Sequence, residues 1–365
     1  MNRLKSVSKR WQTGPSASSA AIVALGVVLS TTAFTFPGKF ARPDSSITRA
    51  AAVPMPARFK TMVSKEVGWA LSASNQVLRT TNGGKSWIIV SSAHNQITPI
   101  ALSADTASRA LLVGAPRQNQ AAIVWATDNA GRHWQTERLP DAVHATGATV
   151  DWFSPIRAWM LVTLAFSTNQ KPPPGYPPPG AMGFENVLYR TTDAGNQWSL
   201  VPSATVPDQV NQMIFTTRST GWMSLTTDAI GPSVPLLAKT VNGGQTWKPL
   251  VLPRPPLLAP HSAKPKIDYA PYAVSGPTFS TPNQGAFLTS YGALNANGTS
   301  KPTYSVVYYT TDGGNRWQWM LLPPYQTTDQ TGFPVKVVWQ STKTGWLLNV
   351  LDSAGTVVAQ WPVGS

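Results

Sequence analysis

The chain has 365 residues, carries a formal net charge of +14 and contains no cysteine. This length is enough to bury a large core, and the absence of cysteine excludes disulfides and thiolate metal sites. Charged residues make up only 12% of the chain, whereas there are 33 Pro, 27 Gly and 15 Trp. Because Pro and Gly interrupt helices, this composition favours an all-β chain with short strands and tight turns.

The excess of positive charge predicts a surface that attracts anionic partners, such as polymers, lipid headgroups or acidic protein faces. Such attraction weakens as salt is added. The alternative is that the charges are spread thinly and only improve solubility. No dense run of Lys and Arg interleaves with aromatic residues, so we do not expect nucleic acid as a partner.

Residues 1–38 join a basic amino terminus to an uncharged stretch whose apolar centre spans residues 20–36. This centre is at the short limit for a membrane-spanning helix, which needs roughly 20 residues. The same order of features is typical of a signal peptide. We expect an uncleaved anchor helix, with a cleaved leader or a buried soluble helix as alternatives. With either an anchor or a leader the basic residues stay cytoplasmic, so the rest is expected outside, tethered to the cytoplasmic membrane or secreted.

Five segments match the pattern Thr-x-[Asp/Asn]-x-Gly-x-x-Trp without a gap. Asp or Asn bonds to backbone amides just ahead, Gly supplies the positive φ of a reversal, and Trp packs over the turn. The pattern therefore predicts a hairpin turn, and we expect each Trp to be structural. The pattern residues are Thr80, Asn82, Gly84, Trp87, Thr127, Asn129, Gly131, Trp134, Thr191, Asp193, Gly195, Trp198, Thr240, Asn242, Gly244, Trp247, Thr310, Asp312, Gly314 and Trp317.

A second element, Gly-Trp or a variant of it, recurs six times, with extended apolar segments on either side. Together with the turn it defines a unit of four strands, which is the construction of a β-propeller blade. Six blades are expected; seven would need a unit that is not recognisable. The six copies begin at Gly68-Trp69, Arg109-Ala110 (degenerate), Ala158-Trp159, Gly221-Trp222, Gly285-Ala286 and Gly345-Trp346.

The last unit has no box turn and no fourth strand before the sequence ends. We expect residues 39–56 to form a linker in which residues 46–53 supply this missing strand and close the ring. The propeller itself is expected over residues 57–365.

The repeated turn resembles the bacterial-neuraminidase (BNR, Asp-box) repeat of sialidases. Together with the Gly-Trp element it resembles the photosystem II assembly and stability factor family of propellers, over roughly residues 57–361. The resemblance implies a non-enzymatic assembly factor that docks on membrane proteins through a basic face. Arg79, Arg190 and Lys239 match the basic position before the box, whereas Ala126 and Tyr309 depart from it. Three boxes also carry Asn where the family favours Asp.

Long insertions fall in the loops expected at one face of such a propeller, at residues 165–186, 251–272 and 291–303. Loops that carry function are commonly elaborated on a regular scaffold. Their proline runs favour extended, pre-ordered conformations. An alternative is that these loops only tolerate insertion. We expect a cationic and aromatic surface for an acidic partner, formed by Lys171, Tyr176, Arg254, Lys264, Lys266 and Tyr269.

Glycoside hydrolysis needs two carboxyls, or for sialidases a Tyr with Glu, an Asp and an arginine cluster. The chain has three glutamates, Glu66, Glu137 and Glu185, with Asp151 and Asp268 as further candidate acids. No sialidase arginine motif is recognisable. The four histidines show no metal or triad spacing, and no phosphate-binding loop opens a helix. We therefore expect no catalytic residue, metal or cofactor.

The sequence thus predicts a monomeric, non-enzymatic scaffold for protein complexes at the outer side of the cytoplasmic membrane. A propeller that binds carbohydrate or an anionic cell-wall polymer is the alternative, and a sialidase-like glycosidase comes third.

Overall fold

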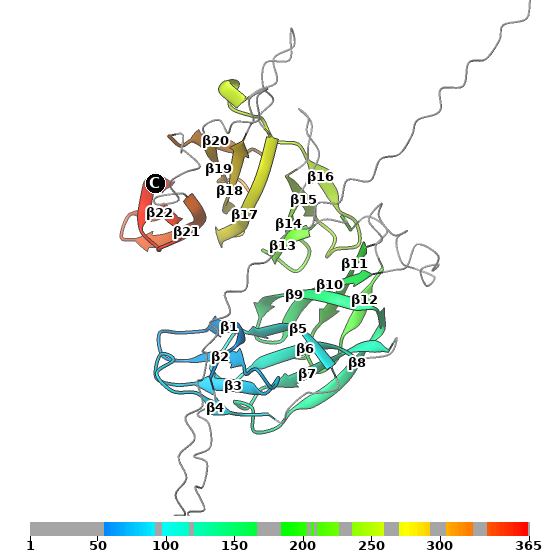
Figure 1. Cartoon of the computed structure of the whole chain (residues 1–365). Helices are drawn as coiled ribbons and strands as arrows, with labels where there is room; N and C mark the ends of the chain where they lie inside the picture. The colour runs from blue at the N-terminus through cyan, green and yellow to red at the C-terminus, as the bar shows by residue number, and fades with distance from the viewer. Residues whose placement is uncertain are drawn as a thin grey trace, which may run out of the picture. The chain divides into compact units, whose positions relative to one another are not determined.

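The computed structural model describes residues 55–91, 97–116, 120–165, 184–202, 206–207, 210–225, 236–258, 270–292, 304–323 and 334–363. In these ranges the chain forms six antiparallel sheets and a three-residue 3-10 helix, Pro256–Leu258 (Figure 1). The predicted all-β class is confirmed. The expected anchor at 1–38 and strand at 46–53 lie outside the described ranges, within which no helix has the length and apolarity of a membrane span.

The first three sheets are four-stranded meanders in chain order. The first contains β1 (Arg58–Met62), β2 (Gly68–Leu71), β3 (Val77–Thr80) and β4 (Ile88–Ile89). The second contains β5 (Ile97–Ala104), β6 (Ala110–Pro116), β7 (Ala121–Thr127) and β8 (Gln135–Val143). The third contains β9 (Ala145–Ser154), β10 (Arg157–Ala165), β11 (Phe184–Thr191) and β12 (Ser199–Val201).

The next two sheets repeat this plan, and the sixth has three strands in the described part of the chain. The fourth contains β13 (Val210–Phe215), β14 (Gly221–Leu225), β15 (Leu237–Thr240) and β16 (Lys248–Leu250). The fifth contains β17 (Ala270–Thr281), β18 (Gln284–Gly292), β19 (Tyr304–Thr310) and β20 (Gln318–Leu321). The sixth contains β21 (Pro334–Thr342), β22 (Gly345–Asp352) and β23 (Val357–Val363).

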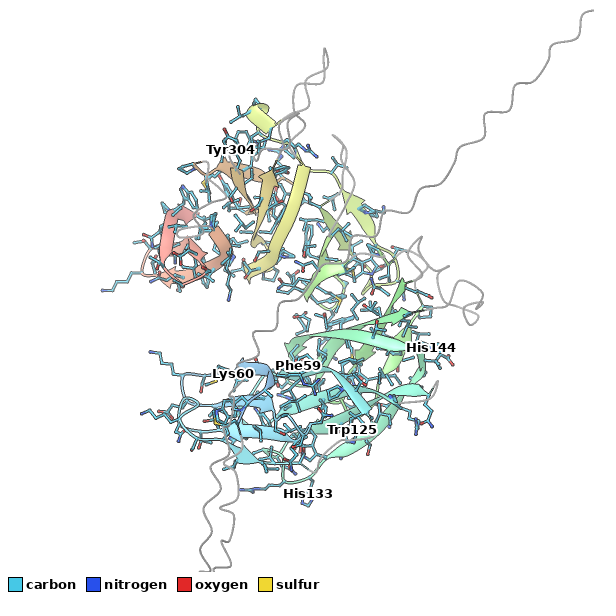
Figure 2. All side chains as sticks on the ribbon, viewed as in Figure 1. Phe59, Lys60, Trp125, His133, His144 and Tyr304 are labelled. Atoms are coloured by element: carbon cyan, nitrogen blue, oxygen red, sulfur yellow. The ribbon has the colours of Figure 1, made fainter. Side chains whose placement is uncertain are left out.

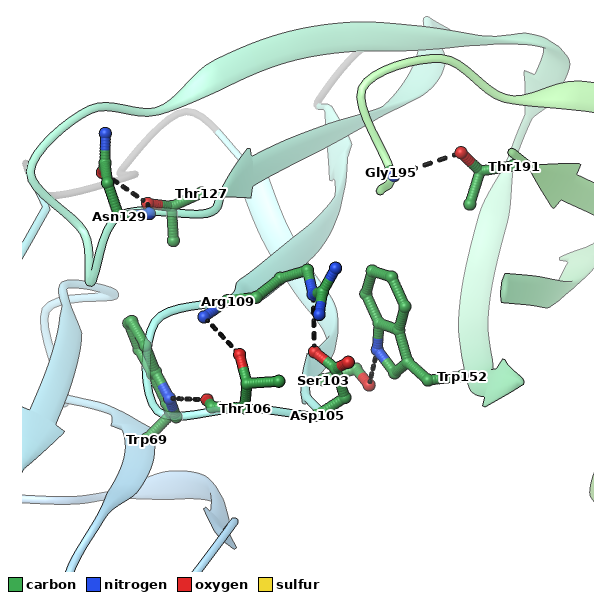
Figure 3. Close-up of polar contacts among 10 residues, drawn as sticks. All are labelled: Trp69, Ser103, Asp105, Thr106, Arg109, Thr127, Asn129, Trp152, Thr191 and Gly195. Atoms are coloured by element: carbon green, nitrogen blue, oxygen red, sulfur yellow. Dashed lines mark hydrogen bonds and ion pairs between the residues drawn. The ribbon is translucent and has the colours of Figure 1, made fainter. Parts of the chain in front are cut away.

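All five box motifs form the predicted reversal between the third and fourth strands of a sheet. In the first, the Thr80 hydroxyl donates to Asn82 Oδ1 at 2.9 Å and accepts from the Gly84 amide at 3.0 Å. Asn82 Oδ1 also accepts from the Ser86 amide at 2.9 Å. The other four boxes repeat these bonds. Figure 3 shows one bond each from the second and third boxes, between Thr127 and Asn129 and between Thr191 and Gly195. Asn therefore serves as well as Asp, because only one side-chain oxygen is needed.

The second strand of the second, third, fourth and fifth sheets alternates its side chains between the two neighbouring sheets. In the third sheet Trp159 and Leu161 pack in a cluster with the fourth sheet. Met160 and Val162 pack with the second sheet. Both faces of the strand are thus buried, which explains why these segments read as continuous apolar runs rather than alternating ones.

The predicted alignment of Arg109-Ala110 with the Gly-Trp element is wrong by one residue. Ala110 pairs with the box residue Thr127, just as Gly68 pairs with Thr80. Leu111, not Ala110, therefore occupies the Trp position, and it packs with the third sheet as that position requires. The second sheet lacks the Gly-Trp landmark, so the sequence alone did not reveal the register.

The first strands of consecutive sheets contact one another in chain order, from β1 to β21. Hydrogen bonds cross between sheets as well: the Trp69 indole donates to the Thr106 carbonyl at 3.3 Å, and Trp152 donates to Ser103 Oγ at 3.1 Å (Figure 3). Successive four-stranded meanders joined through their first strands are consistent with a β-propeller.

Candidate binding site

A cavity of about 470 Å³ lies at the first strands of the fourth, fifth and sixth sheets. We call it the hollow. Its volume falls in the range of small-ligand sites, roughly 300–1,000 Å³. It is lined by Gln212, Ser275, Gly276, Thr278, Phe279, Ser280, Lys336, Val337, Val338, Trp339 and Trp346.

The hollow combines one cation with aromatic walls. Lys336 is exposed, and its ammonium makes no ion pair or hydrogen bond with a described residue. Trp339 is fixed in place, because its indole N–H donates to the Thr278 carbonyl of β17 at 3.2 Å. The described lining includes no carboxyl or imidazole group. This arrangement can hold an anionic group beside apolar surface.

A bulge in β17 shapes one wall of the hollow. The register with β18 shifts between Ser275 and Thr278, and bulges commonly redirect a strand next to a binding site. Gly276 lies there with φ +98°, and a Cβ on it would approach the Phe287 Cβ to 3.2 Å and the Thr278 amide nitrogen to 3.3 Å. Glycine is therefore required for both conformation and space.

Of the six residues expected to bind a partner, Arg254 alone lies in the described part of the chain. The other five, Lys171, Tyr176, Lys264, Lys266 and Tyr269, lie outside it. The Arg254 guanidinium lies 5.4 Å from the ring centroid of Tyr291, a buried residue of β18. Tyr308 donates to the Pro253 carbonyl at 3.0 Å. The segment after β16 thus packs against the end of the β18–β19 hairpin, where the insertion 291–303 begins.

Two of the basic residues before the boxes join sheets together. The Arg79 Nε donates to the Ala107 carbonyl of the second sheet at 2.9 Å, and its guanidinium lies over Trp69. The Lys239 ammonium donates to the Gly313 carbonyl of the fifth sheet at 2.8 Å and lies over Trp222. Burial lowers the pKa of Lys239, and the charge of Asp312 partly opposes this. These positions therefore serve inter-sheet packing, in contrast to the exposed Arg190.

The candidate catalytic carboxyls are dispersed over several sheets. Glu137 accepts from the Trp198 amide at 3.1 Å, and Asp151 accepts from the Phe215 amide at 2.6 Å, so each bonds to the following sheet. Burial raises the pKa of both groups, that of Asp151 to about 6. Glu185 is fully buried in β11, Glu66 is exposed, and Asp268 lies outside the described ranges.

The raised pKa of Asp151 predicts a pH-dependent stability. Its folded pKa of about 6 exceeds the ordinary 3.8, so the folded state binds the proton more tightly than the unfolded state does. Stability should therefore fall by about 2–3 kcal/mol as the pH rises from about 4 to above 6. Asp151→Asn keeps an acceptor for Phe215 but cannot ionise, so its melting temperature should lose this pH dependence.

Thermal unfolding measured between pH 4 and 7.5 tests this prediction. Glu66→Gln, which changes an exposed carboxyl, serves as the control and should melt as the unsubstituted chain does. An unchanged slope in Asp151→Asn would show that the pH dependence arises elsewhere.

Two of the four histidines lie in the described part of the chain. His133 lies within the second box, directly before Trp134, and His144 lies between β8 and β9; Figure 2 shows them at separate places on the molecule. No group of three His, Asp or Glu side chains suited to a metal ion occurs among the described residues.

No protein-family model and no curated protein matches the chain. Solved structures similar to it include YCF48 from Cyanidioschyzon merolae, with 13% identity, TM-score 0.38 and coverage of 82% of this chain and 94% of that chain. YCF48 bound to D1 peptide has 12% identity, TM-score 0.38 and coverage of 83% and 92%. Polysaccharide lyase Uly1 has 10% identity, TM-score 0.43 and coverage of 84% and 88%. These distant matches do not assign a function.

Sequence reasoning did not find the hollow. Ten of its eleven lining residues come from three first strands that are far apart in sequence and have no common motif, and the eleventh, Trp346, comes from β22. The one local signal is Lys336, a lysine within the otherwise uncharged segment of β21.

Proposed function

We propose that the chain is a non-enzymatic scaffold that binds partner proteins at the outer side of the cytoplasmic membrane. Residues 1–38 act as the anchor, or as a leader that is removed on export. This role agrees with the resemblance of the repeated motifs to the propellers of assembly factors. It also agrees with the net charge of +14, which favours acidic partners.

The hollow is the observation that carries the proposal. It offers the Lys336 ammonium to an acidic side chain and the rings of Phe279 and Trp339 to an adjoining apolar one. Interfaces are enriched in such aromatic anchors. Arg254, half-buried in the segment after β16, places a further cation at a second part of the surface.

In the proposed architecture the six sheets close into a six-bladed ring of the Asp-box type. Residues 46–53 pair with β23 as the fourth strand of the sixth sheet. The first five sheets each have this fourth strand, and the chain enters β1 directly after the linker.

Capture of partners from native membranes tests the binding role. We expect Lys336→Glu to reduce capture at low salt by about tenfold or more, corresponding to ~1.4 kcal/mol. Lys343→Glu, an exposed lysine in the β21–β22 turn outside the hollow, makes the same charge change and should retain capture. Equal loss in both variants would indicate a diffuse charge effect and contradict a specific role of the hollow.

Two other results would favour another function. Retention on purified anionic wall polymer, without capture of protein, would support the carbohydrate-binding alternative. Glycosidase activity that is abolished by Glu185→Gln would contradict the non-enzymatic proposal.

A further inference from the structure

The sixth sheet has a strand register that differs from that of the other five. In those sheets the glycine position of the second strand pairs with the residue six positions earlier, as in Met62↔Gly68, Ala104↔Ala110, Trp152↔Ala158, Phe215↔Gly221 and Phe279↔Gly285. In the sixth sheet Gly345 pairs with Thr342, and Trp339 pairs with Leu348. The register is therefore shifted by three residues.

An odd shift turns a strand over, because side chains alternate between the two faces. In the third sheet the Trp position and the residue two after it pack on the following sheet. In the sixth sheet Leu348, two after Trp346, packs instead on the preceding fifth sheet, together with Ala286 and Leu288. Trp346 consequently lies at the hollow, only partly buried.

The sequence of the sixth sheet nevertheless matches that of the fourth across this hairpin. Residues 212–222 read QMIFTTRSTGW, and residues 336–346 read KVVWQSTKTGW. The lengths are equal, and both turns are rich in hydroxyl side chains and contain one basic residue, Arg218 or Lys343. In the fourth sheet the Thr217 hydroxyl accepts from the amides of Ser219 and Thr220, and Ser341 occupies the matching position.

We propose that β22 and β23 of the sixth sheet adopt the common register, in which Trp339 pairs with Gly345, when the ring closes on the first sheet of the same chain. This inference rests on the six-sheet ring proposed above. Trp339 keeps its bond to Thr278, so Lys336 and Trp339 stay in the hollow. Trp346 turns to the opposite face, where the first sheet follows.

The box turn of the first sheet provides a packing site for the Trp346 indole. At Gly314 the ring of Trp222, from the preceding sheet, fills the space that a Cβ would occupy, with Cη2 at 2.1 Å. At Gly84 the three nearest atoms belong to Trp87 and Lys60 of the first sheet itself. None of these three atoms comes from another sheet, so within the described part of the chain the box of the first sheet can receive a side chain of a preceding sheet, and Trp346 supplies it.

Engineered cysteine pairs distinguish the registers, because the chain has no cysteine of its own. Asn349→Cys is combined with Val338→Cys, which faces it in the described register, or with Val335→Cys, which faces it in the proposed one. In the described register Val335 is displaced by about 10 Å along the strand, beyond the ~7 Å reach of a disulfide. We expect the Val335–Asn349 disulfide after mild oxidation, identified by peptide mass spectrometry. A disulfide in the Val338–Asn349 variant alone would overturn the proposal.

The melting temperature of Trp346→Ala provides a second test. If Trp346 packs against the first sheet, Trp346→Ala should lower the melting temperature as much as Trp222→Ala does. If Trp346→Ala lowers the melting temperature no more than Ile88→Ala does, at an exposed position, the proposal is wrong. It is also wrong if the unsubstituted chain forms a dimer that dissociates on Trp346→Ala, because Trp346 would then pack against a second copy of the chain. Partner capture by the Lys336 variants does not depend on the register, so the binding role can fail or hold separately.

Discussion

Gly314→Ala is expected to destabilise the protein by about 3 kcal/mol or more. Gly314 has φ +77°, and an added Cβ would lie 2.1 Å from Cη2 and 2.5 Å from Cζ2 of Trp222. Trp222 is fully buried between Phe279 and Trp317, with ring centroids 5.7 and 5.5 Å away. Because the Trp222 ring is enclosed on both sides, the variant loses stability both from the left-handed backbone conformation of alanine and from the clash with the ring.

Gly355→Ala separates these two contributions. Gly355 has a similar φ of +83°, but nothing lies within 4 Å of an added Cβ. This control should lose only about 1–2 kcal/mol, the cost of the backbone conformation. Urea denaturation gives both free energies of unfolding. Equal losses of unfolding free energy in the two variants would mean that Trp222 does not pack tightly against Gly314 in the box of the fifth sheet.

Trp159→Ala is expected to cost about 3–5 kcal/mol in stability, because it removes a buried, stacked aromatic contact between the third and fourth sheets. The Trp159 ring stacks on Phe215 of the next sheet with centroids 3.9 Å apart and planes 7° apart. Its indole nitrogen makes no hydrogen bond within the described part of the chain. The loss therefore comes from packing rather than from a broken hydrogen bond.

Trp159→Phe is the matched control, since it keeps a ring against Phe215 and leaves no polar group unpaired. We expect it to cost less than about 2 kcal/mol, and Ile88→Ala, at an exposed position, to stay within about 0.5 kcal/mol. The measurement is again urea denaturation. A Phe variant as unstable as the Ala variant would show that the indole is required for a reason other than stacking.

The box turns could be predicted in detail because their information is local. Thr, Asn or Asp, and Gly form the reversal with bonds to residues at most four positions away, so tertiary context changes little. The order of strands in each sheet follows for the same reason, since short turns join antiparallel neighbours. The misaligned copy at Arg109-Ala110 shows the limit: without Trp as a landmark, the register was fixed only by the pairing of Ala110 with Thr127.

The roles of the charged residues were much less predictable. Arg79 and Lys239 match a pattern that implies a basic docking face, yet their donor atoms reach backbone carbonyls of the next sheet. A sequence pattern identifies such a cation but not what it faces, because the facing carbonyls belong to another sheet.

The sequence by itself therefore determined the class of the protein, its four-stranded unit and the five turns, since each depends on residues that are neighbours along the chain. Only the tertiary structure decided which side chains share a cavity, which carboxyls become buried and which strand carries a shifted register. Gln212, Phe279 and Lys336 come from three sheets, and packing between sheets is what brings such distant residues together.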